Sequence, residues 1–275
     1  MPLLTFIVPI RHPQNARDWG ALCARLQQTL ASIANQSHPG WSCVVVANEG
    51  AALPPLPPGV STRRVSFPPN DMHELDKGPR EAVYEAFRLD KGRRVLAGMM
   101  AAPDSRFFMV VDDDDLVSNA IAAHVARHPE ANGWHVDQGF LWNDGGSWFL
   151  RIRRFDGLCG SSLIIRRDLY GLPEREDDAP VDWIRSMLGS HIKIKPILAE
   201  RGTPLAPLPF AGAVYRVGSA DSHSQAPGIL RMRFFNRGVL RDPRRLPANL
   251  LRLRPISPAL RREFFGDAPA AQPGP

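Results

Sequence analysis

Continuous apolar runs and periodic apolar positions alternate along the first half of the chain. The continuous runs are residues 3–10 (LLTFIVPI), 41–47 (WSCVVVA) and 106–111 (RFFMVV). Runs of this length that are rich in β-branched and aromatic residues predict buried strands, and they suit a parallel sheet better than a one-sided antiparallel one. Residues 62–67 predict a further strand.

Between these runs, apolar residues recur at every third or fourth position, which predicts helices with one buried face. These segments are residues 18–36, 81–100 and 118–128. Lys91 and Gly92 predict an interruption of the second helix, because glycine disfavours a helix interior. Strands that alternate with helices predict an α/β fold with a mostly parallel central sheet covered by helices on both faces.

The second half of the chain is more mixed. Strands are predicted at residues 139–142, 148–154, 161–166 and 192–198, a turn at 143–146, and a helix at 182–188. Beyond residue 228 the sequence is rich in Arg and Pro, and the last nine residues are expected to be disordered. We therefore predict one domain over residues 1–225 and a basic extension over residues 226–275.

Composition narrows the class of protein. The chain has 275 residues, 44% hydrophobic and 23% charged, which excludes a wholly disordered or fibrous chain. No apolar run approaches the roughly 20 residues that span a bilayer, and residues 1–10 lack the basic region of a secretory signal. Cys23, Cys43 and Cys159 lie far apart in apolar surroundings, which predicts reduced thiols and a cytoplasmic location.

The positive charge is unevenly distributed. Residues 226–275 contain ten Arg and three acidic residues, so they carry a net charge of +7, whereas the net charge of the whole chain is +6. The remaining 225 residues therefore carry a net charge of −1. Since the basic character belongs to the extension, we expect the domain itself not to bind nucleic acid.

The strand at residues 106–111 runs directly into four aspartates, Asp112, Asp113, Asp114 and Asp115. Ligand sites in open α/β sheets lie at the carboxyl ends of strands. Adjacent carboxylates repel each other, so a cation or a basic partner must neutralise some of them. A hard divalent ion, Mn²⁺ or Mg²⁺, takes oxygen ligands and suits this role. The alternative is a solvated acidic turn that caps the next helix.

Four segments in this order resemble a family 2 glycosyltransferase of the GT-A fold. They are FIVPI at residues 6–10 with its following loop, helix and Gln36, VVVANEG at 44–50, FFMVVDDDDL at 107–116, and GSSLIIRRDLYGLPEREDDAPVDWIRSML at 160–188. The resemblance covers about residues 3–220. It implies a GT-A fold in the domain, which agrees with the α/β pattern.

The resemblance implies a metal-dependent, inverting transfer of a sugar from a nucleotide diphosphate donor, expected to be UDP, to a glycan or lipid-linked acceptor. Asp114, as the third residue of the family's DxD motif, would ligate Mn²⁺ or Mg²⁺. Asp112 would contact the donor ribose or share the metal. Asp113 occupies the variable position of the motif beside the donor, and Asp115 would support the ligands from behind.

The resemblance also implies further donor contacts, at Pro9, Arg11, His12, Asn48, Glu49, Lys91 and Arg94. Asn48 departs from the family, which usually has an aspartate that receives the uracil N–H. An amide both donates and accepts hydrogen bonds, so Asn48 can still pair with a pyrimidine and the base preference stays open. The alternative for Lys91 and Arg94 is a solvated charge on a helix face.

The catalytic base should be a carboxylate near the acceptor hydroxyl. Asp182 is ranked first, since Trp183 follows it as in the family's motif, and Asp178 second. Val181 replaces the Glu expected before Asp182, and Asp182 could be a plain helix cap. By resemblance, His223 would be a further metal ligand and Arg216 a diphosphate contact. An exposed loop histidine is the alternative for His223.

Three other functions stay open at this point. A nucleotidyltransferase would usually carry a Gly-rich loop after the first strand, and this chain has no glycine before Gly20. A non-catalytic GT-A-like binding protein is compatible with Asn48 and Val181. The third, a nucleic-acid-binding module, depends on the Arg-rich extension alone.

The extension suggests a membrane contact. It contains the pairs Phe234-Phe235 and Phe264-Phe265 among its ten Arg residues. Arg beside bulky apolar residues suits peripheral contact with an anionic membrane. The alternative is that its early part packs on the domain and the rest is a solvated, charged extension.

Overall fold

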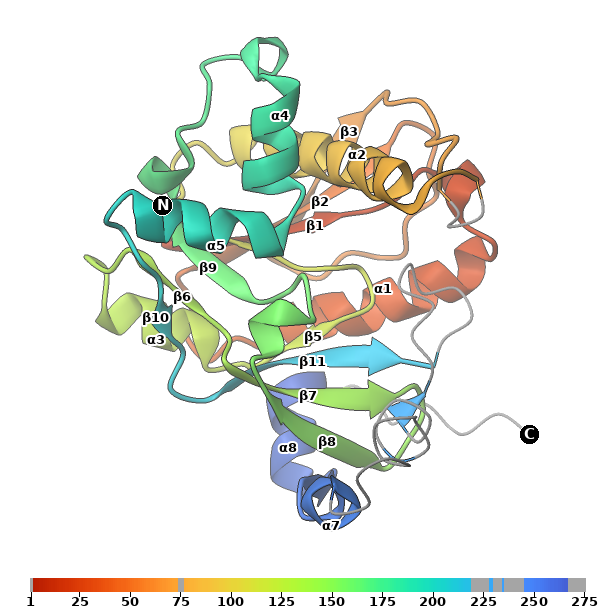
Figure 1. Cartoon of the computed structure of the whole chain (residues 1–275), viewed down its shortest axis with the longest axis vertical. Helices are drawn as coiled ribbons and strands as arrows, with labels where there is room; N and C mark the ends of the chain where they lie inside the picture. The colour runs from red at the N-terminus through yellow and green to blue at the C-terminus, as the bar shows by residue number, and fades with distance from the viewer. Residues whose placement is uncertain (1, 74–76, 219–227, 230–233, 235–244, 267–275) are drawn as a thin grey trace.

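The computed structural model describes residues 2–73, 77–218, 228–229, 234 and 245–266, which form an α/β fold with two sheets (Figure 1). The first sheet contains β1 (Leu4–Pro9), β2 (Trp41–Asn48), β3 (Val60–Val65), β4 (Phe107–Val110), β6 (Gly133–His135), β9 (Leu163–Arg166) and β10 (Ala206–Pro207). The second contains β5 (Leu116–Val117), β7 (Gln138–Asn143), β8 (Trp148–Arg153), β11 (Ala211–Val217) and β12 (Leu253–Pro255).

The helices connect and cover these sheets. They are α1 (Trp19–Ala34), α2 (Arg80–Met100), α3 (Ile121–Arg127), α4 (Val181–Trp183), α5 (His191–Glu200), α7 (Arg245–Leu250) and α8 (Pro258–Phe265). Short 3-10 turns lie at η1 (Pro13–Asn15), η2 (Phe155–Gly157), η3 (Arg167–Tyr170) and η4 (Glu176–Asp178), and a π-helical turn at η5 (Ile184–Leu188).

The first sheet is mostly parallel, as the continuous apolar runs predict. Its strand order is β10-β6-β9-β4-β1-β2-β3, and β1 pairs in parallel with both β2 and β4. Only β9 runs antiparallel to its neighbours β4 and β6 in this sheet of the described chain. Because β1, β2 and β4 run the same way, their carboxyl ends meet along one edge.

Helices cover both faces of this sheet, which confirms the predicted fold class. In Figure 1, α2 and α5 lie on one side of β1 and β2, and α1 with the second sheet lies on the other. One core packs Ile7 and Phe108 against Val95 of α2, and the other packs Phe6 against Leu26 of α1. Both faces of the sheet are thus shielded from solvent by packed apolar side chains.

The predicted interruption of the second helix is wrong. α2 runs unbroken from Arg80 to Met100 through Gly92. A Cβ at position 92 would lie 2.7 Å from the main-chain oxygen of Ile184. Glycine is therefore compatible with the helix here because it lets η5 pack directly on α2, and tertiary packing outweighs the low helix propensity.

The predicted strand at residues 192–198 is also wrong, since this segment belongs to α5. The alternation in IKIKPIL favoured a strand, but Ile194 and Leu198 are the buried residues and their spacing of four is helical. Ser190 caps the helix, because its Oγ accepts a hydrogen bond of 3.4 Å from the amide of Lys193.

The second sheet includes strands that the sequence pattern did not predict. Residues 211–217 form β11, which pairs in parallel with β7 and antiparallel with the two-residue β5. β5 begins at Leu116, directly after the four aspartates, while β4 ends at Val110. The acidic segment is therefore one of the connections between the two sheets.

The described part of the basic extension packs on the domain. β12 pairs antiparallel with β8, and Phe264 of α8 is fully buried against Phe140 and Phe149. Phe264 is therefore not available to enter a membrane. Phe235 and the last nine residues, for which disorder is expected, lie outside the described residues. Over the described residues, no helix is both long and apolar enough to cross a bilayer.

Candidate active site

A cavity of about 380 Å³ opens at the carboxyl edge of the first sheet. Its wall is formed by the ends of β1 and β4, one side of α2, and the start of α5. It brings together much of the predicted donor site, namely Pro9, Arg11, Lys91, Arg94, Asp112, Asp113 and Asp114. Six predicted residues do not line it, namely His12, Asn48, Glu49, Asp178, Asp182 and Arg216. His223 lies outside the described residues.

Asp112 is held by a lysine from the opposite wall. Lys91 Nζ on α2 donates a short hydrogen bond to Asp112 Oδ1 and forms an ion pair with it. Burial raises the pKa of Asp112, but the charge of Lys91 outweighs this and holds that pKa below its ordinary value. Asp112 is therefore ionised and its charge is already balanced.

Asp115 faces the protein interior instead. It is fully buried, and its Oδ2 accepts hydrogen bonds of 2.6 Å from Ser161 Oγ and 3.0 Å from Cys159 Sγ. Ser161 Oγ in turn accepts one of 2.8 Å from the amide of Asp112. Burial, together with the nearby carboxylates, raises the pKa of Asp115 well above its ordinary value. Asp115 thus fixes the shape of the acidic segment through these buried hydrogen bonds.

Asp113 and Asp114 carry charge that the protein balances less well. Arg11 Nη2 lies 3.9 Å from Asp113 Oδ1, yet burial still raises the pKa of Asp113. Burial and the negative charges of Asp113 and Asp112 raise the pKa of Asp114 to about 7. Burial is the larger cause and the neighbouring carboxylates add to it, so a cation at Asp114 would favour its ionised form.

The described residues contain no group of three or more His, Cys, Asp or Glu side chains that could hold a metal ion. Asp112 and Asp114 both line the cavity, so they offer two carboxylates to an ion that binds there. Mg²⁺ is commonly held by one or two carboxylates together with substrate phosphates. The donor set fits a divalent ion shared with a diphosphate, and it does not form a closed metal site made by the described protein side chains alone.

Arg216 is buried behind the cavity. Its guanidinium donates hydrogen bonds to the main-chain oxygen of Asp114 (2.9 Å), to Asp144 Oδ1 (2.5 Å) and to Gln28 Oε1 (2.7 Å). It also lies over the Trp142 ring, 4.8 Å from the centroid. All three nitrogens of the guanidinium have protein partners, so Arg216 positions the Asp114 backbone and does not face the cavity.

Asn48 lies at the end of β2, and both its amide oxygen and its amide nitrogen form hydrogen bonds within the protein. Its Oδ1 accepts a hydrogen bond of 2.7 Å from Arg94 Nη1, and its Nδ2 donates one of 2.6 Å to the Phe67 oxygen. Arg94 is also bonded to Asp90 through Nε and Nη2. Asn48 therefore supports Arg94 from behind, where the sequence suggested contact with the base.

His12 and Glu49 complete the donor-side predictions. His12 caps η1, because its Nδ1 accepts a hydrogen bond of 3.1 Å from the Gln14 amide. Burial and the charge of Arg94 lower the pKa of His12. Glu49 is exposed in the turn after β2. Both lie near the predicted edge, but neither forms the cavity wall.

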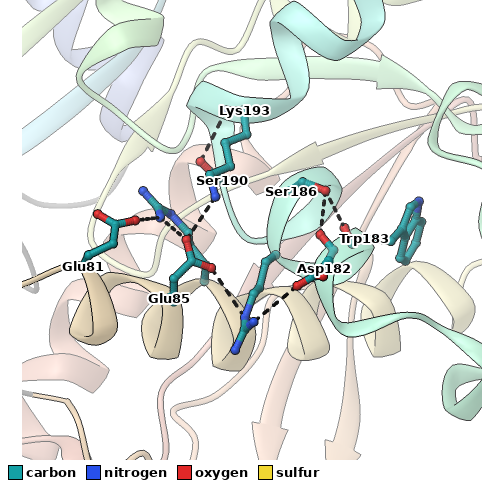
Figure 2. Close-up of polar contacts among 9 residues, drawn as sticks. Glu81, Glu85, Asp182, Trp183, Ser186, Ser190 and Lys193 are labelled. Carbon is teal, nitrogen blue, oxygen red and sulfur yellow. Dashed lines mark hydrogen bonds and ion pairs between the residues drawn. The ribbon is translucent and has the colours of Figure 1, made fainter.

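The two predicted bases lie away from the acidic segment. The Asp182 side chain is 97% exposed, and its Oδ1 lies 3.4 Å from Arg185 Nη1. Arg185 Nε lies 3.5 Å from Glu85 Oε2 on α2, and Glu85 Oε1 also pairs with Lys193 Nζ of α5 at 3.0 Å. Figure 2 shows Asp182, Glu85 and Lys193 in this network. Asp182 thus belongs to a network that fastens α4 and α5 onto α2. Asp178 is an exposed residue of η4.

The cavity also contains residues that the sequence did not single out. Burial and the charge of Lys91 lower the pKa of His191 to about 4, so this ring is neutral at pH 7. Tyr84, Phe87 and Tyr215 add aromatic surface to the wall. His191 shows no recognisable sequence pattern, and it lies directly before the segment 192–198 whose alternation predicts a strand.

Comparison with known proteins gives structural similarity only. No family model matches the sequence, and no curated protein matches it. A crystal structure of S. aureus TarS 1–349 superposes with a TM-score of 0.42 at 14% identity, covering 79% of this chain and 61% of that one. TarS 1–349 in complex with UDP-GlcNAc gives a TM-score of 0.42 at 14% identity, covering 82% and 61%.

Rv0371C of Mycobacterium tuberculosis H37Rv, solved in complex with manganese, gives a TM-score of 0.38 at 12% identity. The match covers 78% of this chain and 90% of that one. This chain spans about three fifths of the TarS 1–349 chain. These TM-scores and identities are too low to assign an activity or a ligand to this chain.

Proposed function

We propose that the chain is a glycosyltransferase of the GT-A fold that binds a nucleotide diphosphate sugar in the cavity beside Asp112 and Asp114. The observation that carries the proposal is the placement of this carboxylate pair at the carboxyl ends of parallel strands, facing the basic side chains of Lys91 and Arg11 across one cavity. Acidic groups for a cation and basic groups for phosphates thus meet in one place.

The chemistry of sugar transfer explains why both charges are needed. The glycosyl centre develops oxocarbenium character in the transition state, and the leaving diphosphate gains negative charge. Asp112 and Asp114 would hold Mn²⁺ or Mg²⁺, which supplies Lewis-acid stabilisation of that leaving group. Lys91 and Arg11 add fixed positive charge from the protein. We propose UDP as the nucleotide, a hexosyl group as the sugar, and inversion as the stereochemical course.

A general base must take the proton of the acceptor hydroxyl in an inverting transfer. Asp182 and Asp178 remain the proposals from the sequence, but neither lies in the cavity wall. The neutral ring of His191 does lie there, at the start of α5. Single variants of the three residues can separate them, because loss of the general base lowers the rate of transfer and leaves donor binding unchanged.

The decisive experiment measures donor binding and turnover together. The full chain is screened for thermal stabilisation by UDP-, GDP- and dTDP-sugars, UDP-GlcNAc among them, with and without Mn²⁺. Hydrolysis of the stabilising donor is then followed. Stabilisation and hydrolysis that both require Mn²⁺ support the proposal. A complete absence of binding by any nucleotide sugar would contradict it.

A second candidate function is a non-catalytic GT-A-like protein that binds a nucleotide sugar. The observation in its favour is that neither predicted base lines the cavity, with Asp182 almost fully exposed. Nucleotide-sugar binding without hydrolysis or transfer would favour this function over the enzyme.

We also propose that the protein acts in the cytoplasm on a glycan or lipid-linked acceptor, with peripheral contact to an anionic membrane through the extension. Leu250 and Leu251 are 57% and 76% exposed, and the exposed Arg252 and Arg254 follow them. Apolar side chains beside Arg residues suit an anionic bilayer surface. No nucleic-acid partner is proposed.

A further inference from the structure

The ion pair of Lys91 and Asp112 places a cation at the acidic segment of the protein itself. Both side chains line the cavity, and they are 29% and 31% exposed, so the pair is accessible from it. The Lys91 ammonium is thus paired with Asp112, which is one of the two carboxylates proposed to bind the divalent ion.

The two partners of this pair differ in how firmly they are held. The amide of Asp112 donates to Ser161 Oγ, which fixes the aspartate at its main chain. Lys91 reaches the pair from α2 on a flexible four-carbon stem. A Cβ at Gly160 would lie 2.8 Å from Lys91 Nζ, so the chain at this position passes close over the ammonium. Lys91 is therefore the partner that can move, and the open side is the cavity.

Among the described residues, no Lys or Arg side chain forms an ion pair with the Asp114 carboxylate as Lys91 does with Asp112, although the charges of Arg11 and Arg216 act on it. The three guanidinium bonds of Arg216 go to the Asp114 main-chain oxygen, Asp144 and Gln28, and none goes to the Asp114 carboxylate. The protein thus neutralises the two carboxylates of the pair unequally. A divalent ion bound by both residues would find the Asp114 carboxylate unpaired with a described Lys or Arg, whereas the Asp112 carboxylate is already paired with Lys91.

We propose that Lys91 is a tethered cation that holds Asp112 in the ligand-free protein and moves to the diphosphate when Asp112 takes up the divalent ion. This inference rests on the proposed function of the cavity. An ammonium and a divalent ion on the same carboxylate repel each other, so Lys91 must leave Asp112. The incoming diphosphate offers the released ammonium a new anionic partner in the same cavity.

The consequence is that the divalent ion and the nucleotide bind cooperatively. The ion alone must displace Lys91 from Asp112 without bringing a new anionic partner for the ammonium, whereas a diphosphate that binds with the ion supplies that partner. By thermodynamic linkage, each ligand raises the affinity for the other by the same factor.

The test measures binding of Mn²⁺ to the full chain, from the electron paramagnetic resonance signal of free Mn²⁺, with and without UDP. We expect UDP to tighten Mn²⁺ binding by about 10-fold in the wild type, within the usual range of coupling. Lys91→Met should bind Mn²⁺ about 10-fold more tightly than the wild type without UDP, and UDP should then tighten Mn²⁺ binding by a smaller factor than in the wild type, because only the direct contact between ion and diphosphate remains. Arg93→Met is the matched control, since it removes one exposed charge from the same helix.

Lys91→Met with unchanged or weaker Mn²⁺ binding in the absence of UDP overturns the inference, while UDP-dependent Mn²⁺ binding by the wild type leaves the proposed function standing. No Mn²⁺ binding by the wild type under either condition overturns both. Lys91→Arg keeps the charge and should follow the wild type. If it behaves like Lys91→Met, charge is not the cause and the inference also fails. Circular dichroism establishes that each variant is folded.

Discussion

Arg94 Nη1 lies 2.7 Å from Asn48 Oδ1, so this hydrogen bond joins α2 to the end of β2. Arg94 is 1% exposed and also pairs with Asp90. Removing one partner of a buried charged pair costs about 3–5 kcal/mol. We therefore expect Arg94→Met to lower the free energy of unfolding by about 3 kcal/mol, measured by chemical denaturation.

The neighbouring Arg93 provides the control for this prediction. Its side chain is exposed, so Arg93→Met should change the stability by less than about 0.5 kcal/mol. Equal losses from the two variants would show that Arg94 has no special structural role.

Removal of the metal-binding group should stop turnover. If Asp114 shares a divalent ion with the diphosphate, Asp114→Ala should abolish donor hydrolysis while the protein stays folded. EDTA should have the same effect on the wild type, and added Mn²⁺ should restore activity to the wild type only. Full donor hydrolysis in EDTA would exclude the metal-dependent mechanism.

The metal-free protein should lose stability as the pH rises through the acidic range. The pKa of Asp114 is about 7 when folded, against an ordinary value of 3.8, so the folded state binds the proton more tightly. Stability from this group is complete below about pH 4 and is lost as the pH rises to about 7. In EDTA, the stability advantage of Asp114→Asn over the wild type should therefore grow between these values and level off above them.

Chemical denaturation across pH 4–8 measures this difference, with the exposed Asp104 as the control. Asp104→Asn should shift stability by less than about 0.5 kcal/mol at every pH. An advantage of Asp114→Asn that does not vary with pH would contradict the assignment.

The exposed position of Asp182 predicts a small kinetic effect. Asp182→Asn keeps the size of the side chain and its proximity to Arg185, so transfer should stay within about threefold of the wild type. A general base is instead worth roughly 10² to 10⁴ in rate. A loss of that size with unchanged donor binding would restore Asp182, or Asp178 if its variant shows it, as the base. The same measurement on His191→Asn tests the ring in the cavity.

Membrane contact should depend on Leu250 and Leu251. Their double replacement by serine should weaken sedimentation with anionic liposomes at low salt, because it removes the exposed apolar surface beside Arg252 and Arg254. Truncation at residue 228 is not a suitable test, since it removes the fully buried Phe264. Unchanged liposome binding by the double variant would exclude this surface as the anchor.

The sequence predicted the parts of the fold that depend on local pattern. The apolar runs of β1, β2 and β4 are buried on both faces, so their composition alone distinguishes them. The pattern failed for α5, where alternate lysines imitate a strand, and for Gly92, whose role depends on the approach of Ile184. Contacts between distant segments decide such cases, and no local window contains them.

The same limit explains which site residues could be predicted. Asp112 and Asp114 follow a buried strand directly, so their place at the sheet edge is a local property. Asn48 and Arg216 were expected at the ligand, but each is used by a partner far away in the sequence, Arg94 and Gln28 respectively. Whether a polar side chain faces a cavity or another side chain is decided by tertiary packing.

The connection from β4 to β5 has a consequence for how this chain can diverge. Only residues 111–115 separate the last residue of β4 from the first residue of β5, and these strands belong to different sheets. Loss or gain of one residue there would turn the side chains of Leu116 and Val117 in β5 to the opposite face of the sheet, or shift the register of β5 against β11. Substitutions along this segment should therefore be tolerated more readily than changes of its length. Among distant relatives, we expect the spacing between the two strands to be a more durable alignment marker than the number of aspartates it contains.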